Sequence, residues 1–412
     1  MRNRHPELLI PASSLEVLKT AVMFGADAVY IGGEAFGLRA KAKNFSMEDM
    51  KEGVQFAHEH GARVHVTVNI LAHNDDLEGA AEYLKELKEI GPDALIIADP
   101  AIFMLAKEIC PEIERHVSTQ ANNTNYGTFN FWWNLGAKRV VTARELSLKE
   151  IREIRAHIPE EMEIESFIHG AMCISYSGRC LLSNFFTGRD ANQGACTHPC
   201  RWKYSVVEET RPGEYMPVYE NERGTYIFNS KDLCMIEHIP EMIDAGIDSF
   251  KIEGRMKTAL YVATVARTYR KAIDDYLEDP KKYEANMPWY RDQISNCTYR
   301  QFTTGFYFGK PGDESQIYDS NTYIKEYTYL GIIGGIKDGM YRIEQRNKFS
   351  VGETVEIMKP DGQNVEVTVE KIVDEDGQEQ ESAPHPKQVL YVALSGEASV
   401  YDILRRQEDV TE

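Results

Sequence analysis

One pattern repeats along the first 280 residues of this 412-residue chain: a short apolar run, a polar or glycine-rich tip, and a helical stretch. Helical stretches such as 13–26 and 75–91 carry apolar residues at three- and four-residue spacing. Because short strands that alternate with helices form βαβ units, the repeat predicts a parallel sheet. The apolar runs span residues 7–12, 28–33, 63–69, 94–99, 115–120, 139–145, 163–170, 225–232 and 249–255.

The number of these runs decides the architecture. Eight strand–helix units close into a (β/α)8 barrel, whereas a doubly wound sheet usually has fewer strands and often a G-x-G-x-x-G motif. No such motif follows any of the runs. There is one run more than a barrel needs, and the surplus is either 225–232 or part of the hairpin-like segment 203–224. We therefore expect a TIM-like (β/α)8 barrel over residues 1–280, with a cysteine-rich insert at about 171–224.

Several helical stretches end in glycine before the next apolar run, as expected of a left-handed C-cap that turns the chain into a parallel strand. These glycines are Gly25, Gly61, Gly91, Gly136 and Gly246.

The pattern changes after residue 280. Residues 281–323 are aromatic, polar and irregular, and we expect a connector that wraps on the barrel. In residues 324–412, short alternating strands are separated by Asp-Gly turns at 338–339, 361–362 and 376–377. Such turns are typical of β-hairpins, so the C-terminus is predicted to form a small antiparallel β-barrel domain.

Composition limits the location and partners of the protein. The N-terminal residues lack the apolar core of a signal peptide, and no segment reaches the roughly 18 apolar residues of a membrane span. We expect a cytoplasmic protein without a membrane span, and seven cysteines fit a reducing compartment. The net charge of −19 argues against tight binding of nucleic acid, which usually requires a basic surface.

Five of the cysteines are clustered in sequence, at spacings C-x6-C, C-x15-C, C-x3-C and C-x33-C. Structural zinc sites normally show paired C-x2-C units, so these spacings match zinc poorly. An iron–sulfur cluster needs four thiolates but no single fixed spacing, and fits better. The five are Cys173, Cys180, Cys196, Cys200 and Cys234, whereas Cys110 and Cys297 are expected to be buried core residues.

Polar side chains stand at the ends of nearly all the apolar runs, where a barrel enzyme carries its chemistry. Ser118, Ser230 and Asp99 are equally well explained as helix caps. Arg255, Glu145 and His169 are not usual caps, so a functional role is favoured for them.

A family resemblance rests on residues 165–183, which read E-S-F-I-H-G-A-M-C, four further residues, and G-R-C-L-L-S. This stretch resembles the signature of peptidase family U32, the collagenase-like proteins, position for position. The later runs R-D-A-N-Q-G-A-C, C-R-W, K-D-L-C and K-I-E-G-R also look like that family. The resemblance covers most of the chain and implies a two-domain protein with a C-terminal β domain.

The family is named for collagen-degrading activity, but other members are hydroxylation factors for RNA or quinones that carry a 4Fe–4S cluster. This chain looks most like the branch that forms 5-hydroxyuridine at the tRNA wobble position with prephenate as co-substrate. The resemblance implies tRNA as a partner, and a paralogous partner subunit is an open alternative to action alone. The implied cluster ligands are Cys173, Cys180, Cys196 and Cys234, with Cys200 as an alternative to Cys196.

Beside the cluster we expect a basic patch at the strand ends. Arginine suits bidentate contacts to a dicarboxylate such as prephenate or to RNA phosphate. The candidate substrate-binding residues are Arg189, Lys231 and Arg255, and the candidate catalytic residues are His169, Arg179 and Glu165. Surface ion pairs with the abundant acids are the alternative explanation for these cations.

A peptidase is the rival interpretation. The chain has no H-E-x-x-H zinc motif and no G-x-S-x-G nucleophile elbow. A Cys173 nucleophile that meets His169 or His198 in space, or a bound metal, stays open. A cysteine peptidase needs one activated thiol rather than five, so the redox interpretation is preferred.

Overall fold

The computed structural model describes residues 5–37, 44–173, 175–202, 205–206, 216–217, 229–297, 301–311, 315–317 and 327–408. The chain divides into two compact units. The first comprises Met1–Lys19, Asp27–Met256 and Arg300–Thr322, and the second comprises Thr20–Ala26, Lys257–Tyr299 and Tyr323–Glu412. Among the described residues, none of the helices is both long enough and apolar enough to cross a bilayer.

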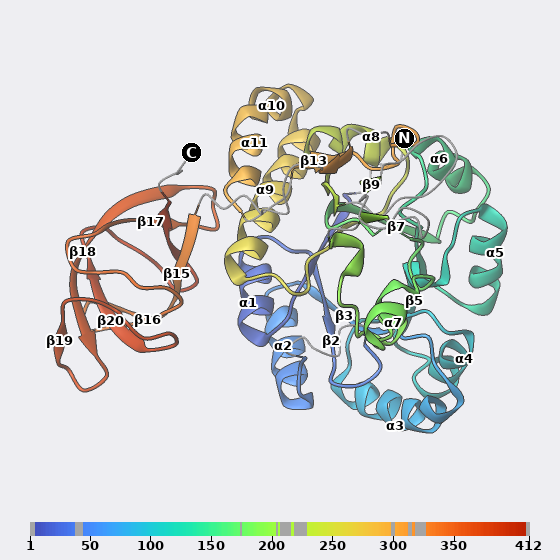
Figure 1. The fold of residues 1–412 in the computed structure, drawn as a ribbon, viewed down its shortest axis with the longest axis horizontal. Helices are drawn as coiled ribbons and strands as arrows, with labels where there is room; N and C mark the ends of the chain where they lie inside the picture. The colour runs from blue at the N-terminus through green and yellow to red at the C-terminus, as the bar shows by residue number, and fades with distance from the viewer. Residues whose placement is uncertain are drawn as a thin grey trace. The chain divides into compact units, whose positions relative to one another are not determined.

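The first unit is built on a closed ring of parallel strands (Figure 1). Each strand pairs with the next along the ring, and the last strand pairs with both β7 and β1, which closes the barrel. The prediction of a TIM-like barrel is confirmed. The ring strands are β1 (Glu7–Pro11), β2 (Ala28–Gly32), β3 (Arg63–Val68), β4 (Ala94–Ile97), β5 (Glu114–Val117), β6 (Arg139–Val141), β7 (Glu163–Gly170) and β12 (Ser249–Ile252).

The helices alternate with these strands and lie around the ring (Figure 1). The five glycines predicted to cap helices all have positive φ, which confirms the predicted way in which the chain turns back toward the next strand. The helices that separate ring strands are α1 (Leu15–Met23), α2 (Met47–Glu59), α3 (Asn74–Ile90), α4 (Pro100–Ile109), α5 (Tyr126–Leu135), α6 (Leu148–Ala156) and α8 (Ile239–Asp244).

The described end of the surplus run at 225–232 is not one of the ring strands. Its described end leads into β11 (Asp232–Cys234), which pairs antiparallel with β7 and parallel with β13 (Phe302–Thr303). Just before it, β10 (Asn229–Ser230) pairs with β14 (Gln316–Ile317). Residues 225–228 lie outside the described part of the chain. In the hairpin-like segment, β8 (Ser205–Val206) and β9 (Met216–Pro217) pair antiparallel.

The second unit contains a closed antiparallel barrel around a core that includes Leu330, Ile357 and Val392. Its strands pair around the ring in the order β17, β21, β15, β16, β20, β18 and back to β17. Between β15 and β16, Asp338 and Gly339 both have positive φ, as the predicted hairpin turn requires. The strands are β15 (Tyr327–Lys337), β16 (Met340–Glu344), β17 (Thr354–Met358), β18 (Asn364–Asp374), β20 (Val389–Leu394) and β21 (Ile403–Gln407), with β19 (Glu379–Gln380) beside β18.

The expectation of an irregular stretch after residue 280 is wrong for its first part. After α9 (Ala259–Glu278), the chain forms α10 (Pro280–Ala285) and α11 (Met287–Ser295). Asp279 caps α10 by accepting a hydrogen bond from the Lys281 backbone, and Pro280 occupies the first helical position. Asp-Pro is a recognised helix start, and this signal was overlooked because the surrounding residues are polar and aromatic.

Candidate functional site

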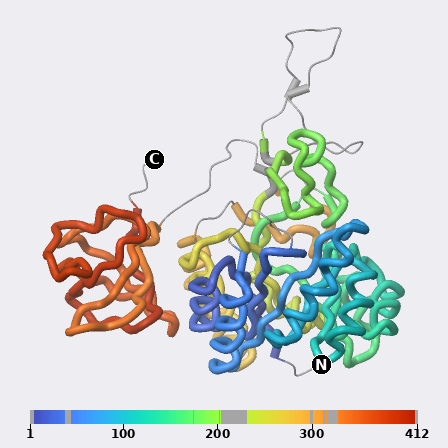
Figure 2. Tube along the Cα trace, turned by 90° about the horizontal axis from the view of Figure 1, so that it is seen from below, coloured from blue at the N-terminus to red at the C-terminus, as the bar shows by residue number. Residues whose placement is uncertain are grey.

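The C-terminal end of the barrel is covered by residues 175–202, which we call the covering segment. It contains α7 (Leu182–Thr187), η2 (Ala191–Gln193) and η3 (Pro199–Arg201). Figure 2 shows this segment, in green, over one end of the barrel. Hydrogen bonds tie it to the loops that follow β3, β5 and β6, so the covered end is the one where the strands finish.

The contacts that hold the covering segment are specific. Asn122 Nδ2 donates to the Ser177 carbonyl at 2.8 Å, and Arg144 Nη1 donates to Ser177 Oγ at 3.0 Å. The Leu71 backbone N–H donates to the Asn192 carbonyl at 3.3 Å. Arg144 also pairs with Glu253 at 3.2 Å and lies 3.9 Å from the centre of the Phe167 ring. This arginine links the strand ends to the segment above them.

The predicted cluster ligands all lie on β11 or on the chain that follows β7. None of the seven cysteines is in a disulfide, and all five clustered thiols are at least partly accessible. Cys173 is exposed, and Cys180, Cys196, Cys200 and Cys234 are half-buried. Cys110 and Cys297 are buried, which confirms their predicted place in the core. Burial raises the pKa of the Cys110 thiol to about 11, so this cysteine is protonated at neutral pH.

Cys196 has the clearest surroundings of the five. The His198 backbone N–H donates to Cys196 Sγ at 3.4 Å, and Cys196 Sγ lies 3.9 Å from His198 Nδ1. Hydrogen bonds to sulfur tune a thiolate ligand in an iron–sulfur site. The same thiol–imidazole contact is also what a cysteine nucleophile would require.

His169 and Cys234 are brought together by strand pairing. Cys234 on β11 is the direct antiparallel partner of His169 on β7. Side chains opposite each other in an antiparallel pair leave the sheet on the same face, with Cβ atoms about 5 Å apart. His169 is 1 % exposed, and its ring lies 5.8 Å from that of Phe302. The structure therefore places the predicted catalytic histidine beside a predicted cluster ligand.

The predicted cations occupy different surroundings at this end of the barrel. Arg255 is buried, and its Nη1 donates to Thr67 Oγ1 at 2.7 Å. A Cβ atom at Gly32 would lie 2.2 Å from Arg255 Nη1, so a side chain at the end of β2 would displace the Arg255 guanidinium from this position. Arg179 and Arg189 are exposed on the covering segment, and Lys231 is half-buried before β11. That these side chains together bind one ligand stays a prediction.

Aromatic side chains stand exposed on the same segment as Arg179 and Arg189. Phe185 is 83 % exposed, an unusual position for such a large apolar side chain. Its ring stands edge-on to that of Phe186 at 5.2 Å, and Phe186 lies 6.2 Å from Trp202. We call the exposed aromatic side chains of this segment the aromatic ridge. The ridge consists of Tyr176, Phe185, Phe186 and Trp202.

Glu165 lies apart from the thiols, inside the barrel. It is 0 % exposed and accepts hydrogen bonds from Lys251 Nζ at 2.6 Å and Arg139 Nη1 at 3.1 Å. Arg139 also pairs with Glu7 and with Glu163. Burial acts to raise the pKa of the Glu7 carboxyl, but the charge and hydrogen bonds of Arg139 hold that pKa well below its usual value.

Two histidines complete this polar interior, His65 on β3 and His116 on β5, both 0 % exposed. Burial lowers the pKa of both imidazoles well below the ordinary value, so both are neutral near pH 7. The sequence interpretation missed them because runs 63–69 and 115–120 were read as apolar. Polar residues at alternate positions of a strand were the available signal, since alternate side chains of a barrel strand face the interior.

Comparison with known proteins identifies families and relatives that this chain resembles. Residues 13–317 match peptidase family U32, and residues 325–405 match the peptidase family U32 C-terminal domain. A Bacillus subtilis (strain 168) protein named tRNA hydroxylation protein P1 is 43% identical over 405 residues, which cover 98% of this chain and 95% of that protein. Escherichia coli (strain K12) tRNA hydroxylation protein P is 39% identical over 420 residues, covering 92% of this chain and 91% of that protein.

A third relative carries a different name. An uncharacterized protease of Methanocaldococcus jannaschii is 42% identical over 305 residues, which cover 73% of each chain. The family matches together span both the parallel barrel and the C-terminal antiparallel barrel. The chain therefore belongs to peptidase family U32.

Proposed function

We propose that this enzyme hydroxylates the base of a uridine in tRNA, at C5 of the wobble position. The observation that carries the proposal is the near end-to-end match to relatives named for tRNA hydroxylation, at 43% and 39% identity. Hydroxylation of C5 oxidises the base, which agrees with redox-capable thiols on β11 and on the chain that follows β7. We place the reaction in the cytoplasm, where tRNA is available.

The aromatic ridge supports RNA as the substrate. Unpaired bases of an RNA loop stack on exposed aromatic side chains and on arginine, which needs no basic surface over the whole protein. Phe185, Phe186 and Trp202 offer such faces, and Arg179 and Arg189 on the same segment can meet the phosphates. A local arrangement of this kind answers the objection raised by the net charge of −19.

The thiols fit a 4Fe–4S cluster by their chemistry. None of these cysteines is in a disulfide, all are at least partly accessible, and Cys196 receives a backbone hydrogen bond. We propose Cys173, Cys180, Cys196 and Cys234 as ligands, with Cys200 as the alternative to Cys196. When bound, such a cluster supplies one-electron redox chemistry. His169, opposite Cys234, is positioned to hold or move a proton beside it.

A dicarboxylate co-substrate such as prephenate would need fixed cations. Arg255 is held by Thr67 at the strand ends, and Arg179, Arg189 and Lys231 lie on the chain that covers or borders the same end. Arginine can hold each carboxylate by two parallel hydrogen bonds, which would orient the co-substrate. We propose Arg255 as the buried anchor of such a ligand. A paralogous subunit that shares the tRNA is a further part of the proposal.

Substitution in the aromatic ridge tests the RNA part. Loss of one stacking ring costs about 1–3 kcal/mol of binding, so Phe185→Ala should weaken binding of an anticodon stem–loop by about tenfold. The measurement is a titration of the labelled stem–loop at fixed salt. Phe131→Ala is the matched control, because Phe131 is also exposed, at 54 %, but lies on α5. Equal affinities for wild type, Phe185→Ala and Phe131→Ala would remove the ridge from the proposal.

The Cys196–His198 contact favours one alternative, a cysteine peptidase as the family name suggests. That activity would make cluster-free protein cleave gelatin and lose cleavage in Cys196→Ser. Intact gelatin after prolonged incubation with the cluster-free protein would eliminate this alternative.

A further inference from the structure

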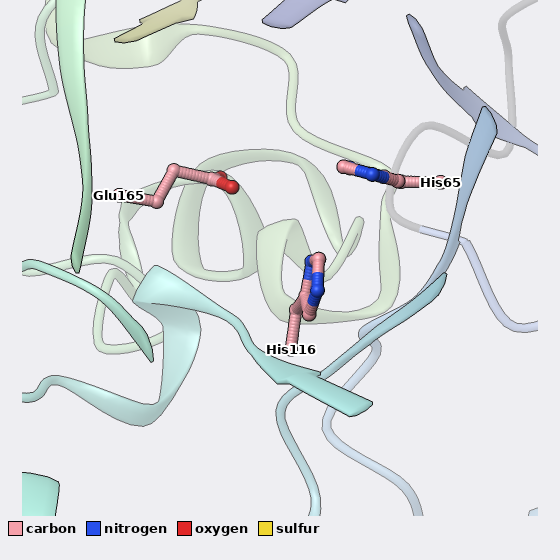
Figure 3. Close-up of side chains that lie close together, drawn as sticks. All are labelled: His65, His116 and Glu165. Atoms are coloured by element: carbon pink, nitrogen blue, oxygen red, sulfur yellow. The ribbon is translucent and has the colours of Figure 1, made fainter. Parts of the chain in front are cut away.

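Three buried side chains converge inside the barrel, away from the covering segment. His65 from β3, His116 from β5 and Glu165 from β7 point toward one another (Figure 3). One ring nitrogen of each histidine and one carboxylate oxygen of Glu165 lie within 4.8 Å of one another. All three residues are 0 % exposed. Among the described residues, it is the one group of three or more histidine, cysteine or acidic side chains whose possible ligand atoms all lie this close together.

The imidazoles present nitrogens without hydrogen-bond partners. Three of these ring nitrogens have no hydrogen-bond partner within the described part of the chain. They are both nitrogens of His65 and Nδ1 of His116. Buried polar groups are nearly always paired, and each one left unsatisfied costs about 1–3 kcal/mol. The two rings stand edge-on with centroids 4.8 Å apart, so neither ring satisfies the other. These nitrogens are therefore available to bind a further group between the three side chains.

The outer contacts are those of a metal site. His116 Nε2 lies 3.0 Å from Glu114 Oε2, which favours the tautomer whose Nδ1 keeps a free lone pair. A carboxylate that receives the second ring N–H is the usual support of a metal-bound histidine. Glu165 is in turn oriented by Lys251 and Arg139, as ligating carboxylates commonly are.

Charge does not prevent a cation from entering. Arg139 is paired with Glu7 and Glu163 as well as with Glu165, and Arg63 is paired with Glu114 at 2.7 Å. Lys251 is paired with Glu165 and lies 4.4 Å from the centre of the Tyr30 ring. The cations near Glu165 are thus already balanced by carboxylates, and both histidines are available in the neutral form that binds metals.

We propose that His65, His116 and Glu165 bind one divalent first-row transition-metal ion inside the barrel, separate from the cysteines. Two imidazoles and one carboxylate suit zinc or iron(II) and leave coordination positions open. Such a set is a poor match for calcium or magnesium, which prefer oxygen ligands throughout. The ion would satisfy the nitrogens of His65 and His116 and connect three strands of the ring.

The test separates this ion from any metal held by thiols. Full-length protein with Cys173, Cys180, Cys196, Cys200 and Cys234 all replaced by serine is produced in cobalt-supplemented medium, and its metal content is measured. About one cobalt ion per chain is expected, with visible ligand-field absorption and no thiolate charge-transfer band. Adding His65→Leu or Glu165→Gln should lower the cobalt content at least about tenfold, and Glu114→Gln should weaken retention by about 10–100-fold.

The test has a control variant outside the triad and a second measurement in case the serine variant does not fold. His58→Ala should retain the ion, because His58 is exposed on α2 and outside the triad. If the serine variant does not fold, the same absorption is compared in cobalt-grown wild type and His65→Leu. Folded protein without cobalt, or cobalt that persists in folded His65→Leu, would overturn the proposal. A tRNA hydroxylation defect would not affect this readout, so the outcome is independent of the proposed function.

Discussion

Individual polar residues distinguish the two ends of this barrel. At the end where the strands finish, the thiols, His169 and the exposed arginines are at least partly accessible or lie beside accessible groups. Toward the strand starts, the buried Arg139 forms ion pairs with Glu7 and Glu163, which are only partly accessible. Ligands enter barrel enzymes at the first of these ends, so catalysis is assigned there. Glu165, which belongs to the interior, is better explained as a support or metal ligand than as a partner of His169.

Replacement of single cysteines tests which of these residues bind the cluster. Protein purified without oxygen should contain about four iron ions and four sulfides per chain. Cys173→Ala, Cys180→Ala and Cys234→Ala should each lose most of the iron, because each removes a ligand. Iron content of Cys196→Ala and Cys200→Ala decides between these two residues.

Cys110→Ala provides the control for that experiment. Cys110 is buried and its Sγ–H donates to the Ala106 carbonyl, so its replacement should reduce stability by about 1 kcal/mol and leave iron unchanged. Full iron content in Cys173→Ala or Cys180→Ala would refute the ligand assignment.

At the scale of helices and strands, the sequence predicted most of the fold because the repeat is local and regular. Apolar runs and glycine C-caps determine where each parallel strand begins, and Asp-Gly turns determine the hairpins of the C-terminal barrel. Strand partners of β11 could not be predicted, because antiparallel pairing with β7 depends on contacts distant in sequence. The helix α10 was missed although its Asp279-Pro280 start is a local signal, because the polar and aromatic residues around it were read as irregular.

The same limit applies to the candidate site. The cysteines could be found from their density, and Arg255 from its place after an apolar run. The proximity of His169 to Cys234 and of His65 to His116 arises only from strand register. The spacing of residues within one sequence does not show which residues of different strands become neighbours.

Asp275 provides a prediction at the element scale, because it fastens α9 to the two helices that follow. Its carboxylate accepts hydrogen bonds from Tyr290 Oη at 2.5 Å, Asn286 Nδ2 at 2.8 Å and Lys271 Nζ at 2.8 Å. Asp275→Asn should lower the free energy of unfolding by about 2 kcal/mol at pH 7, since hydrogen bonds to a charged group are lost. Asp274→Asn on the same helix, with an exposed carboxylate, should cost less than about 0.5 kcal/mol.

The Asp275 effect should depend on pH. Burial opposes ionisation, but the hydrogen bonds from Lys271 and Tyr290 hold the pKa of the Asp275 carboxyl well below its usual value. The unfolded chain therefore binds a proton at higher pH than the folded chain, so the stabilisation is fully present above about pH 4 and decreases progressively as the pH falls below that value toward the folded-state pKa. Urea unfolding at several pH values should show the difference between wild type and Asp275→Asn shrinking as pH falls through that value. A difference that stays constant down to pH 3 would contradict this assignment.

The whole molecule is acidic, and the substrate that we propose for it is an RNA. Two folded units are present, and the C-terminal barrel has its own core of buried aliphatic side chains. A net charge of −19 leaves the covering segment, with its arginines and aromatic ridge, as the surface that we assign to RNA. A partner subunit could extend that surface, and the requirement for such a partner is part of the same proposal.

We propose that this enzyme hydroxylates tRNA uridine and that its cysteines hold an iron–sulfur cluster needed for the reaction. The most direct test is nucleoside analysis of total tRNA from a strain that lacks the gene, complemented with wild type, Cys173→Ser or Cys110→Ala. Nucleosides derived from 5-hydroxyuridine should disappear in the deletion strain, return with wild type and Cys110→Ala, and stay absent with Cys173→Ser. An unchanged nucleoside profile in the deletion strain, or full restoration by Cys173→Ser, would contradict the account.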